Sequence, residues 1–409
     1  MENSSNLTSL PEEDSRNAET APHGVTKLPS AFSSKPDRPP IQTSSQKYAP
    51  LDWSDYFDQE DDVCIPDSEN VFHIYKAGTE GPVVFCLHGG GYSGLSFALS
   101  ASKIKEKARV VALDLRGHGK SSTDNDVNLS IETLCNDVLA VLKTMYGDAP
   151  PAIVIIGHSM GGAVAVHLAA KKVLPGLSGL VVVDVVEGTA LASLIHMQKI
   201  LSSRMQHFST IEKAIEWSLK GGSLRNIDSA RVSIPGTLTY DVQEVSTLTC
   251  ATRGVAAVIP TELDWKKPSN FGEADMELLH FRYEGLSEKF LSCPAPKLLL
   301  LAGTDRLDRT LTIGQMQGKF QMVVVRHTGH AIQEDVPDEF ANLILNFISR
   351  NRIGPNGIEE FAVHHEQNLE HWYKEIEVCY GVVTKDWNHC SRSVSSENFE
   401  DFVSDYLSY

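Results

Sequence analysis

The chain has 409 residues and a formal net charge of −17 at pH 7, which excludes the basic surface that nucleic-acid-binding proteins present. Most of that charge lies in two acidic stretches, 52–69 and 351–409, so the remaining sequence is close to neutral. No apolar run reaches the roughly 20 residues that a transmembrane helix needs, and residues 1–50 lack the apolar core of a signal peptide. Seven scattered cysteines favour reduced thiols and a cytoplasmic or nuclear location. We therefore expect neither a membrane nor a nucleic acid among the partners.

The sequence divides into three parts. Residues 1–46 are rich in Ser, Pro, Glu, Asn and Thr, and this composition predicts a disordered segment. Between residues 47 and 352, short apolar runs alternate with helical patterns. Such alternation predicts one α/β domain with a mostly parallel, doubly wound sheet. Residues 353–409 form an acidic extension, and no pattern in it predicts whether it is ordered.

The first motif with chemical content is a glycine-rich loop after an apolar strand. The run Val83–Leu87 leads directly into His88-Gly89-Gly90-Gly91. Glycines at such a place let backbone N–H groups approach the carbonyl oxygen of a substrate, so we expect Gly90 or Gly91 to donate to an oxyanion. The alternative, a loop that binds phosphate, lacks the Gly-Lys-Ser/Thr ending of that motif.

The second motif is a Gly-x-Ser-x-Gly sequence between a strand and a helix. A β-branched run, 153–156, ends in Gly157-His158-Ser159-Met160-Gly161, and the helix-forming stretch Ala163–Lys172 follows. This arrangement is typical of a nucleophile elbow, in which a sharp turn exposes the serine hydroxyl. Ser159 is therefore the predicted nucleophile, and the N–H of Met160 is the second predicted oxyanion donor.

Two further histidines are interpreted as structural. His158 lies beside the nucleophile, where adjacent side chains of the turn point apart, so we expect it to pack rather than to act as the base. His118 lies in Asp114–Ser121, after the strand Arg109–Leu113, where a recurrent structural turn is expected.

A general base is expected far downstream. The strand-like run Gln321–Val325 precedes Gly329-His330 and an acidic helix start, and the amphipathic stretch 340–348 closes the domain. His330 is the predicted base, because a hydrolase histidine follows the last strand, and His327 is the competing candidate.

The acidic member of the triad is ambiguous from chain order alone. Asp184 ends the strand 180–183, whereas Asp305 and Asp308 follow the strand 298–301. All three lie between the serine and the histidine, and position alone favours the later strand. Pairing with Arg306 is an alternative, structural role for Asp305 or Asp308.

The stretch 189–290 is too long for a simple crossover between two strands. We expect it to form a helical cap over the active site.

Several longer motifs resemble one family. They are Gly157–Ala163, the sequence Asp-Val-Val-Glu-Gly-Thr-Ala at 184–190, Ile313–Lys319 and Gly329-His330-Ala331. Together they are similar to the protein phosphatase methylesterases, over residues 48–235 and 284–352. The resemblance implies an α/β-hydrolase fold with the cap inserted after the strand that follows the elbow.

The resemblance also implies an activity. Members of the family demethylate the methyl-esterified C-terminal leucine of the protein phosphatase 2A catalytic subunit, which would be the partner of this chain. The catalytic acid of the family follows the strand after the elbow, which favours Asp184 over Asp305 and Asp308. A triad of Ser159, Asp184 and His330 requires no metal and no other cofactor.

Two regions depart from the family. Residues 236–283 lack the tryptophan- and tyrosine-rich helix expected there, and residues 355–409 match no pattern of the family. Two other hypotheses remain open, and the altered cap is the reason for the second. One is a generic serine carboxylesterase or lipase, and the other is a regulator that sequesters the phosphatase with little turnover.

Overall fold

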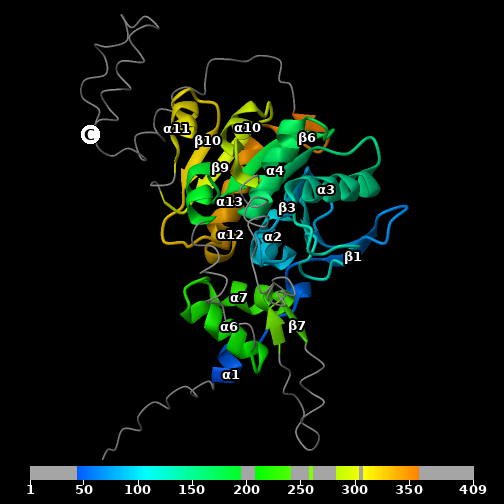
Figure 1. The fold of residues 1–409 in the computed structure, drawn as a ribbon, viewed down its shortest axis with the longest axis vertical. Helices are drawn as coiled ribbons and strands as arrows, with labels where there is room; N and C mark the ends of the chain where they lie inside the picture. The colour runs from blue at the N-terminus through cyan, green and yellow to red at the C-terminus, as the bar shows by residue number, and fades with distance from the viewer. Residues whose placement is uncertain (1–43, 195–207, 241–257, 261–281, 304–306, 359–409) are drawn as a thin grey trace, which may run out of the picture. The chain divides into compact units, whose positions relative to one another are not determined.

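The computed structural model describes residues 44–194, 208–240, 258–260, 282–303 and 307–358 (Figure 1). Residues 1–43 and 359–409, which hold most of the predicted disordered segment and acidic extension, lie outside the described residues. So do residues 304–306, with Asp305 and Arg306, and large parts of the predicted cap.

An eight-stranded sheet organises the fold. Its first two strands run antiparallel to their neighbours, whereas the strands from β4 to β10 are parallel to one another. Along the sheet the order is β1 (Gln59–Cys64), β2 (Val71–Ala77), β4 (Arg109–Leu113), β3 (Val83–Leu87), β5 (Ile153–His158), β6 (Leu177–Val183), β9 (Lys297–Leu301) and β10 (Gln321–Val324). The carboxyl ends of β3, β5, β6 and β10 therefore meet at one edge, where α/β proteins place their sites.

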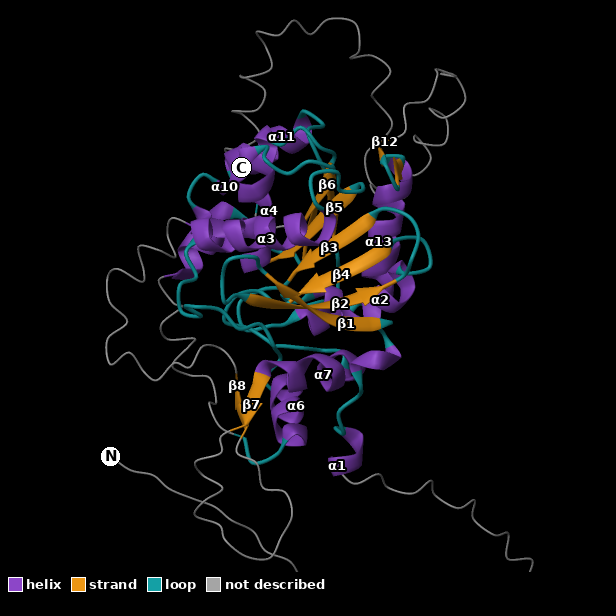
Figure 2. Cartoon of the chain, turned by 90° about the vertical axis from the view of Figure 1, so that its right-hand side faces the viewer, coloured by secondary structure: helices purple, strands orange, loops and turns teal. Residues whose placement is uncertain are grey.

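Helices cover both faces of the sheet (Figure 2). Both faces must be covered, because each carries apolar side chains. In β3, for example, successive side chains belong alternately to two hydrophobic cores. Phe85 and Leu87 pack with α3 and α4, and Val84 and Cys86 pack with α2 and α13. A strand buried on both faces reads as a continuous apolar run, which is the pattern that predicted these strands.

Two helices had predicted bounds, and both lie close to them: α4 (Met160–Lys171) was expected at Ala163–Lys172, and α13 (Pro337–Arg350) contains the amphipathic stretch 340–348. The elbow helix starts at Met160, directly after the serine, rather than at Ala163. The helical elements are α1 (Ser44–Lys47), η1 (Trp53–Asp55), η2 (Gly94–Phe97), α2 (Ala98–Ile104), α3 (Ile131–Tyr146), α4 (Met160–Lys171), α6 (Ile211–Lys220), α7 (Ile227–Ser233), η3 (Ile234–Thr237), α10 (Leu286–Ser292), α11 (Arg309–Met316), α12 (Ile332–Asp335) and α13 (Pro337–Arg350).

The longest described part of the predicted cap is residues 208–240, which we call the inserted segment. It contains α6, α7 and η3, which agrees with a helical insertion after β6. It also contains β7 (Leu238–Tyr240), which pairs antiparallel with β8 (Val258–Pro260), a pairing that the sequence did not indicate. The inserted segment meets the domain at η2 and α12, and the N–H of Leu51 donates to the carbonyl of Arg231.

Two short strands, β11 (Ile353–Gly354) and β12 (Gly357–Ile358), continue the fold into the beginning of the predicted acidic extension. The N–H of Ala152, just before β5, donates to the carbonyl of Pro355. Within the described ranges, no helix is both long enough and apolar enough to cross a bilayer.

Candidate active site

Ser159 sits at the turn between β5 and α4 in a backbone conformation that side chains rarely adopt, with φ +50° and ψ −113°. Such a conformation costs about 1–3 kcal/mol and persists where the surroundings impose it. Here the N–H of Ser159 donates to the carbonyl of Val183, and its own carbonyl accepts the N–H of Ala163. The turn is therefore the elbow that the sequence predicts.

The two motif glycines are required by close backbone contacts. A Cβ on Gly157 would lie 2.2 Å from the carbonyl oxygen of Gly161. A Cβ on Gly161 would lie 2.3 Å from the carbonyl oxygen of Leu87, at the end of β3. Any larger residue would thus push the elbow away from the neighbouring strand and from the glycine loop.

Asp184 and His330 lie side by side at the same edge of the sheet. The imidazole Nδ1 of His330 donates to Oδ2 of Asp184 at 2.8 Å, while the N–H of Ala302 donates to Oδ1 at 2.9 Å. The side chain of Asp184 is fully buried, whereas that of His330 is 44% exposed. A carboxylate held in this way fixes the tautomer of the ring and leaves Nε2 free of the proton.

The other candidate residues have different surroundings. Asp308 caps α11, because its Oδ1 accepts the N–H of Leu311, and its Oδ2 accepts the hydroxyl of Ser287. Both carboxylate oxygens of Asp308 are thus engaged in local structure. His327 is exposed and has φ +62°. Asp305 lies outside the described residues.

The glycine loop lies against the nucleophile. A Cβ on Gly89 would come within 3.3 Å of the Ser159 Cβ, and one on Gly90 would lie 3.9 Å from the sulfur of Met160. The N–H of Gly91 donates to Nε2 of His118 at 3.1 Å. The N–H of Met160 has no acceptor within its own helix, because Met160 is the first residue of α4.

Two neutral imidazoles hold this loop. Burial lowers the pKa of both His88 and His118, so each ring keeps one N–H donor and one acceptor nitrogen. His88 donates from Nδ1 to the carbonyl of Gly89 and accepts the N–H of Leu115 at Nε2. His118 donates from Nδ1 to the carbonyl of Arg116 and accepts the N–H of Gly91.

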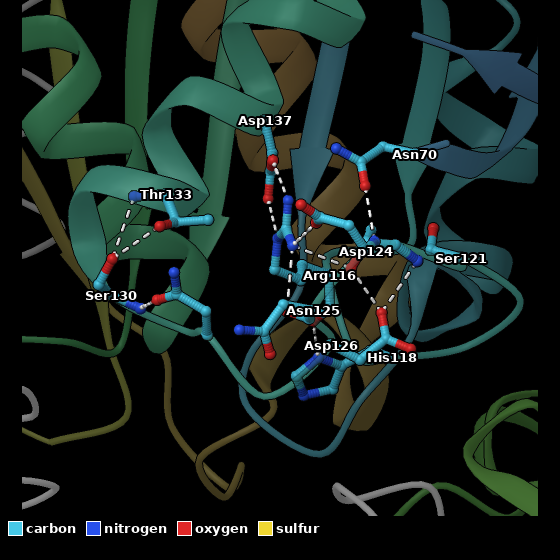
Figure 3. Close-up of polar contacts among 12 residues, drawn as sticks. Asn70, Arg116, His118, Ser121, Asp124, Asn125, Asp126, Ser130, Thr133 and Asp137 are labelled. Atoms are coloured by element: carbon cyan, nitrogen blue, oxygen red, sulfur yellow. Dashed lines mark hydrogen bonds and ion pairs between the residues drawn. The ribbon is translucent and has the colours of Figure 1, made fainter. Parts of the chain in front are cut away.

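The turn that carries His118 is itself anchored on α3 (Figure 3). The guanidinium of Arg116 binds both oxygens of Asp137, through Nε at 2.7 Å and Nη2 at 2.9 Å. Its Nη1 donates to Asp124 at 2.8 Å and to the carbonyl of Asn125 at 3.0 Å. This bidentate pair holds the turn 114–121 in place. The turn therefore positions Nε2 of His118, the acceptor of the Gly91 N–H.

His158 is buried beside His330 and has a role that packing alone does not describe. Its Nε2 donates to the backbone carbonyl of His330 at 2.9 Å, and the two ring centroids lie 4.7 Å apart. Burial lowers the pKa of His158 to about 3, so the ring is neutral. It therefore restrains the backbone of the candidate base.

Sequence reasoning missed Asp335. The carboxylate accepts the N–H of Gly329 at 2.6 Å and the N–H of Arg225, in the inserted segment, at 2.8 Å. The available signal was the acidic pair Glu334-Asp335, four and five residues after His330, which was interpreted as a helix start. Within the described ranges, no group of three His, Cys, Asp or Glu side chains could hold a metal ion.

Comparison with known proteins identifies the class. Residues 83–343 match the alpha/beta hydrolase family. Among solved structures, E-2-(acetamidomethylene)succinate hydrolase superposes with a TM-score of 0.55 at 18% identity, over 71% of this chain and 99% of that one. An esterase of Mycobacterium tuberculosis superposes with a TM-score of 0.52 at 18% identity, over 71% of this chain and 92% of that one. The chain belongs to the α/β-hydrolase family, and the predicted fold class is confirmed.

Closer relatives define the family within that class. Proteins named protein phosphatase methylesterase 1 from Mus musculus and Homo sapiens are each 42% identical over 363 residues, covering 78% of this chain and 93% of theirs. A probable protein phosphatase methylesterase 1 from Caenorhabditis elegans is 41% identical over 356 residues, covering 85% of this chain and 92% of its own. The chain is a member of the protein phosphatase methylesterase family, as its motifs predict.

Proposed function

We propose that this chain is a serine esterase that removes the methyl ester from the C-terminal leucine of the protein phosphatase 2A catalytic subunit. The observation that carries the proposal is the 2.8 Å hydrogen bond between His330 and Asp184, at the same sheet edge as Ser159 on its strained elbow. The names of the relatives support a methylesterase role. The phosphatase 2A substrate rests on the family resemblance.

In this proposal His330 is the base that activates the nucleophile. Its Nδ1–H donates a hydrogen bond to Asp184 and keeps its proton, so Nε2 can take the proton of Ser159 as the hydroxyl attacks the ester carbonyl. The buried carboxylate stabilises the imidazolium that forms. His330 then gives its proton to the leaving methoxide, and methanol departs.

The tetrahedral oxyanion needs donors on the opposite side of Ser159. We assign them to the N–H of Met160 and the N–H of Gly90. The N–H of Gly91 is already bound to His118, and this favours Gly90 among the two predicted loop donors. Water then attacks the acyl-enzyme with His330 as base, which releases the free leucine carboxylate and restores Ser159.

The partial exposure of His330 suits a substrate that arrives on the end of a protein. A methylated tail offers one small ester, so selectivity requires contacts with the body of the phosphatase. We propose that the inserted segment supplies some of them, and its connection to the histidine loop through Arg225 and Asp335 supports this.

The test uses the purified full chain and the methylated phosphatase catalytic subunit, read with an antibody to the free C-terminal carboxylate. Wild type should generate the free carboxylate, and Ser159→Ala should not. Hydrolysis of short acyl esters without demethylation would instead indicate a generic carboxylesterase. Retention of the phosphatase with neither reaction would indicate a sequestering regulator.

A further inference from the structure

A single carboxylate lies between the inserted segment and the loop that carries His330. Asp335, the last residue of α12, accepts the N–H of Gly329 through Oδ2 at 2.6 Å. The hydroxyl of Thr328 donates to the same oxygen at 3.3 Å. The other oxygen, Oδ1, accepts the N–H of Arg225 at 2.8 Å, from a position 110 residues earlier in the chain.

This arrangement leaves little room for either segment to move independently. The side chain of Asp335 is buried, and a Cβ added to Gly329 would lie 3.1 Å from its Oδ2. Hydrogen bonds from N–H groups to a carboxylate are stronger than those between neutral groups. A displacement of the backbone at Arg225 must therefore displace Asp335 or break a strong bond.

The neighbouring residue, Glu334, makes a second connection to the inserted segment. Its backbone carbonyl accepts the hydroxyl of Ser229 at 2.7 Å, and its Oε2 accepts the hydroxyl of Ser233 at 2.6 Å. Both serines lie on α7. Thus α12 is joined to the inserted segment at two successive residues, and Asp335 is the one that also reaches the histidine loop.

His330 follows Gly329 directly, so three restraints define its position. Asp335 holds the N–H of Gly329, His158 donates to the carbonyl of His330, and Asp184 accepts from its Nδ1. Among these three restraints, the one made by Asp335 is shared with the inserted segment. The other two come from residues that lie at the carboxyl ends of β5 and β6.

We propose that Asp335 is a positioning residue that couples the inserted segment to His330. The proposal rests on the proposed function, in which His330 is the general base. A protein substrate that contacts the inserted segment shifts or steadies the backbone at Arg225, and Asp335 transmits the change to Gly329 and His330. A displacement of about 1 Å at a catalytic group can cost roughly a hundredfold in rate, so a small movement is sufficient.

The test compares Asp335→Asn with the matched control Asp338→Asn. Asparagine preserves the size of the side chain, but its NH₂ group cannot accept a hydrogen bond, so one of the two backbone N–H groups loses its acceptor. Asp338 is an exposed acid nearby, on α13, that pairs with Lys103. The measurements are kcat and KM for a small acyl ester, and the rate at which a fluorophosphonate labels Ser159, at temperatures well below each Tm.

In Asp335→Asn we expect kcat and the labelling rate to fall by about tenfold or more with KM within about twofold, because the base is misplaced while the ester-binding surface is intact. Amide hydrogen exchange should accelerate both in 222–230 and in 326–332. Asp338→Asn should leave all of these values unchanged. If Asp335→Asn does not fold, Thr328→Val removes the 3.3 Å bond to Asp335, together with the 3.2 Å bond from the same hydroxyl to the carbonyl of Gly329, and should lower kcat by about twofold to fivefold.

A folded Asp335→Asn with wild-type kcat would overturn the positioning role. Faster exchange in one of the two segments alone would overturn the coupling. Failure of the proposed catalytic mechanism gives a different result, because wild type and Ser159→Ala would then hydrolyse the small ester equally. Failure of the proposed substrate alone would show as an absence of phosphatase demethylation, which these measurements do not use. Active wild type, inactive Ser159→Ala and unchanged Asp335→Asn would refute the coupling while leaving the esterase intact.

Discussion

Two loops flank Ser159, and they are held in different ways. The glycine loop, His88–Gly91, is fixed by neutral imidazoles, His88 and His118, that belong to the hydrolase domain itself. The histidine loop, Thr328–His330, is fixed by the carboxylates of Asp184 and Asp335 and by the ring of His158. One of those carboxylates also binds the inserted segment.

The difference has a functional meaning. The hydrogen bond that His118 accepts from Gly91 is supported within the hydrolase domain, because the turn of His118 is anchored on α3 through Arg116 and Asp137. Tyr92, directly after Gly91, packs against side chains of the inserted segment, but this contact is apolar. The position of the proposed base, His330, depends on the inserted segment, because Asp335 binds both Arg225 and Gly329. The polar restraints on the glycine loop thus come from the hydrolase domain, whereas one polar restraint on the histidine loop is shared with the inserted segment.

The nucleophile lies between the two loops, and its removal should have the largest effect. We expect Ser159→Ala to lower esterase turnover by roughly four to six orders of magnitude, because the nucleophile and base act as a unit. Turnover of a small ester and labelling by a fluorophosphonate measure this. Labelling that survives the substitution would assign the nucleophile to another residue.

On the histidine side, Asp184→Asn should lower kcat by roughly four orders of magnitude, because an amide favours the wrong tautomer of His330. The matched variants Asp308→Asn and Asp305→Asn should mainly affect stability, since Asp308 caps α11. Steady-state kinetics and thermal unfolding separate the two outcomes. A loss of kcat in Asp305→Asn or Asp308→Asn equal to that in Asp184→Asn would refute this assignment.

On the glycine side, His118→Leu removes the acceptor of the Gly91 N–H and frees the loop. We expect kcat to fall by about 10- to 100-fold with little change in KM. This decrease is no larger than the decrease caused by removing an oxyanion donor outright. His118→Gln places an amide oxygen near the position of Nε2 and should recover a large part of the rate. Equal rates for the two variants would show that the hydrogen bond to Gly91 does not position the loop.

A smaller effect is expected on stability, at the junction with the inserted segment. Burial raises the pKa of Glu334 to about 8 from a usual value of 4.5, so between these pH values the folded state holds a proton that the unfolded state has lost. The free energy of unfolding therefore falls as the pH rises, by up to about 1.4 kcal/mol per pH unit. The stabilisation by the bound proton is complete below the pKa of Glu334 in the unfolded state. It is lost as the pH rises through the pKa of Glu334 in the folded state.

Glu334→Gln removes this proton exchange while keeping the shape of the side chain. The Tm of the variant relative to wild type should therefore be higher at about pH 8.5 than at about pH 6. Glu339→Gln, at an exposed position on α13, is the control and should show a constant difference. Parallel curves for Glu334→Gln and wild type would contradict a buried, protonated carboxyl.

Much of this site follows from sequence patterns that have a local cause. The apolar run 153–156 followed by two glycines around Ser159 has one compact solution, a strand that turns into a helix, and the structure contains it. The same holds for Val83–Leu87, whose continuous apolar character reflects burial on both faces. Such patterns predict the structure correctly because the conformation of these segments is determined mainly by residues close in sequence.

The rest depends on contacts between distant segments. Chain order alone could not choose among Asp184, Asp305 and Asp308, because it does not say which strand end faces the histidine. The choice between Gly90 and Gly91 depends on His118, 27 residues beyond Gly91. The local pattern around Asp335 indicated only the start of a helix. Its contact with Arg225 joins residues 110 positions apart, and no local pattern predicts such a contact.

The acidic strand β1 has a consequence for solubility. It forms one edge of the eight-stranded sheet and pairs along its length with β2. Glu60, Asp61 and Asp62 lie in that strand and are exposed. A free edge is a template for pairing with a second molecule, and like charges facing each other oppose that pairing. Replacing the three acids with their amides should therefore increase self-association, measured by light scattering, whereas an unchanged signal would mean that other features protect the edge.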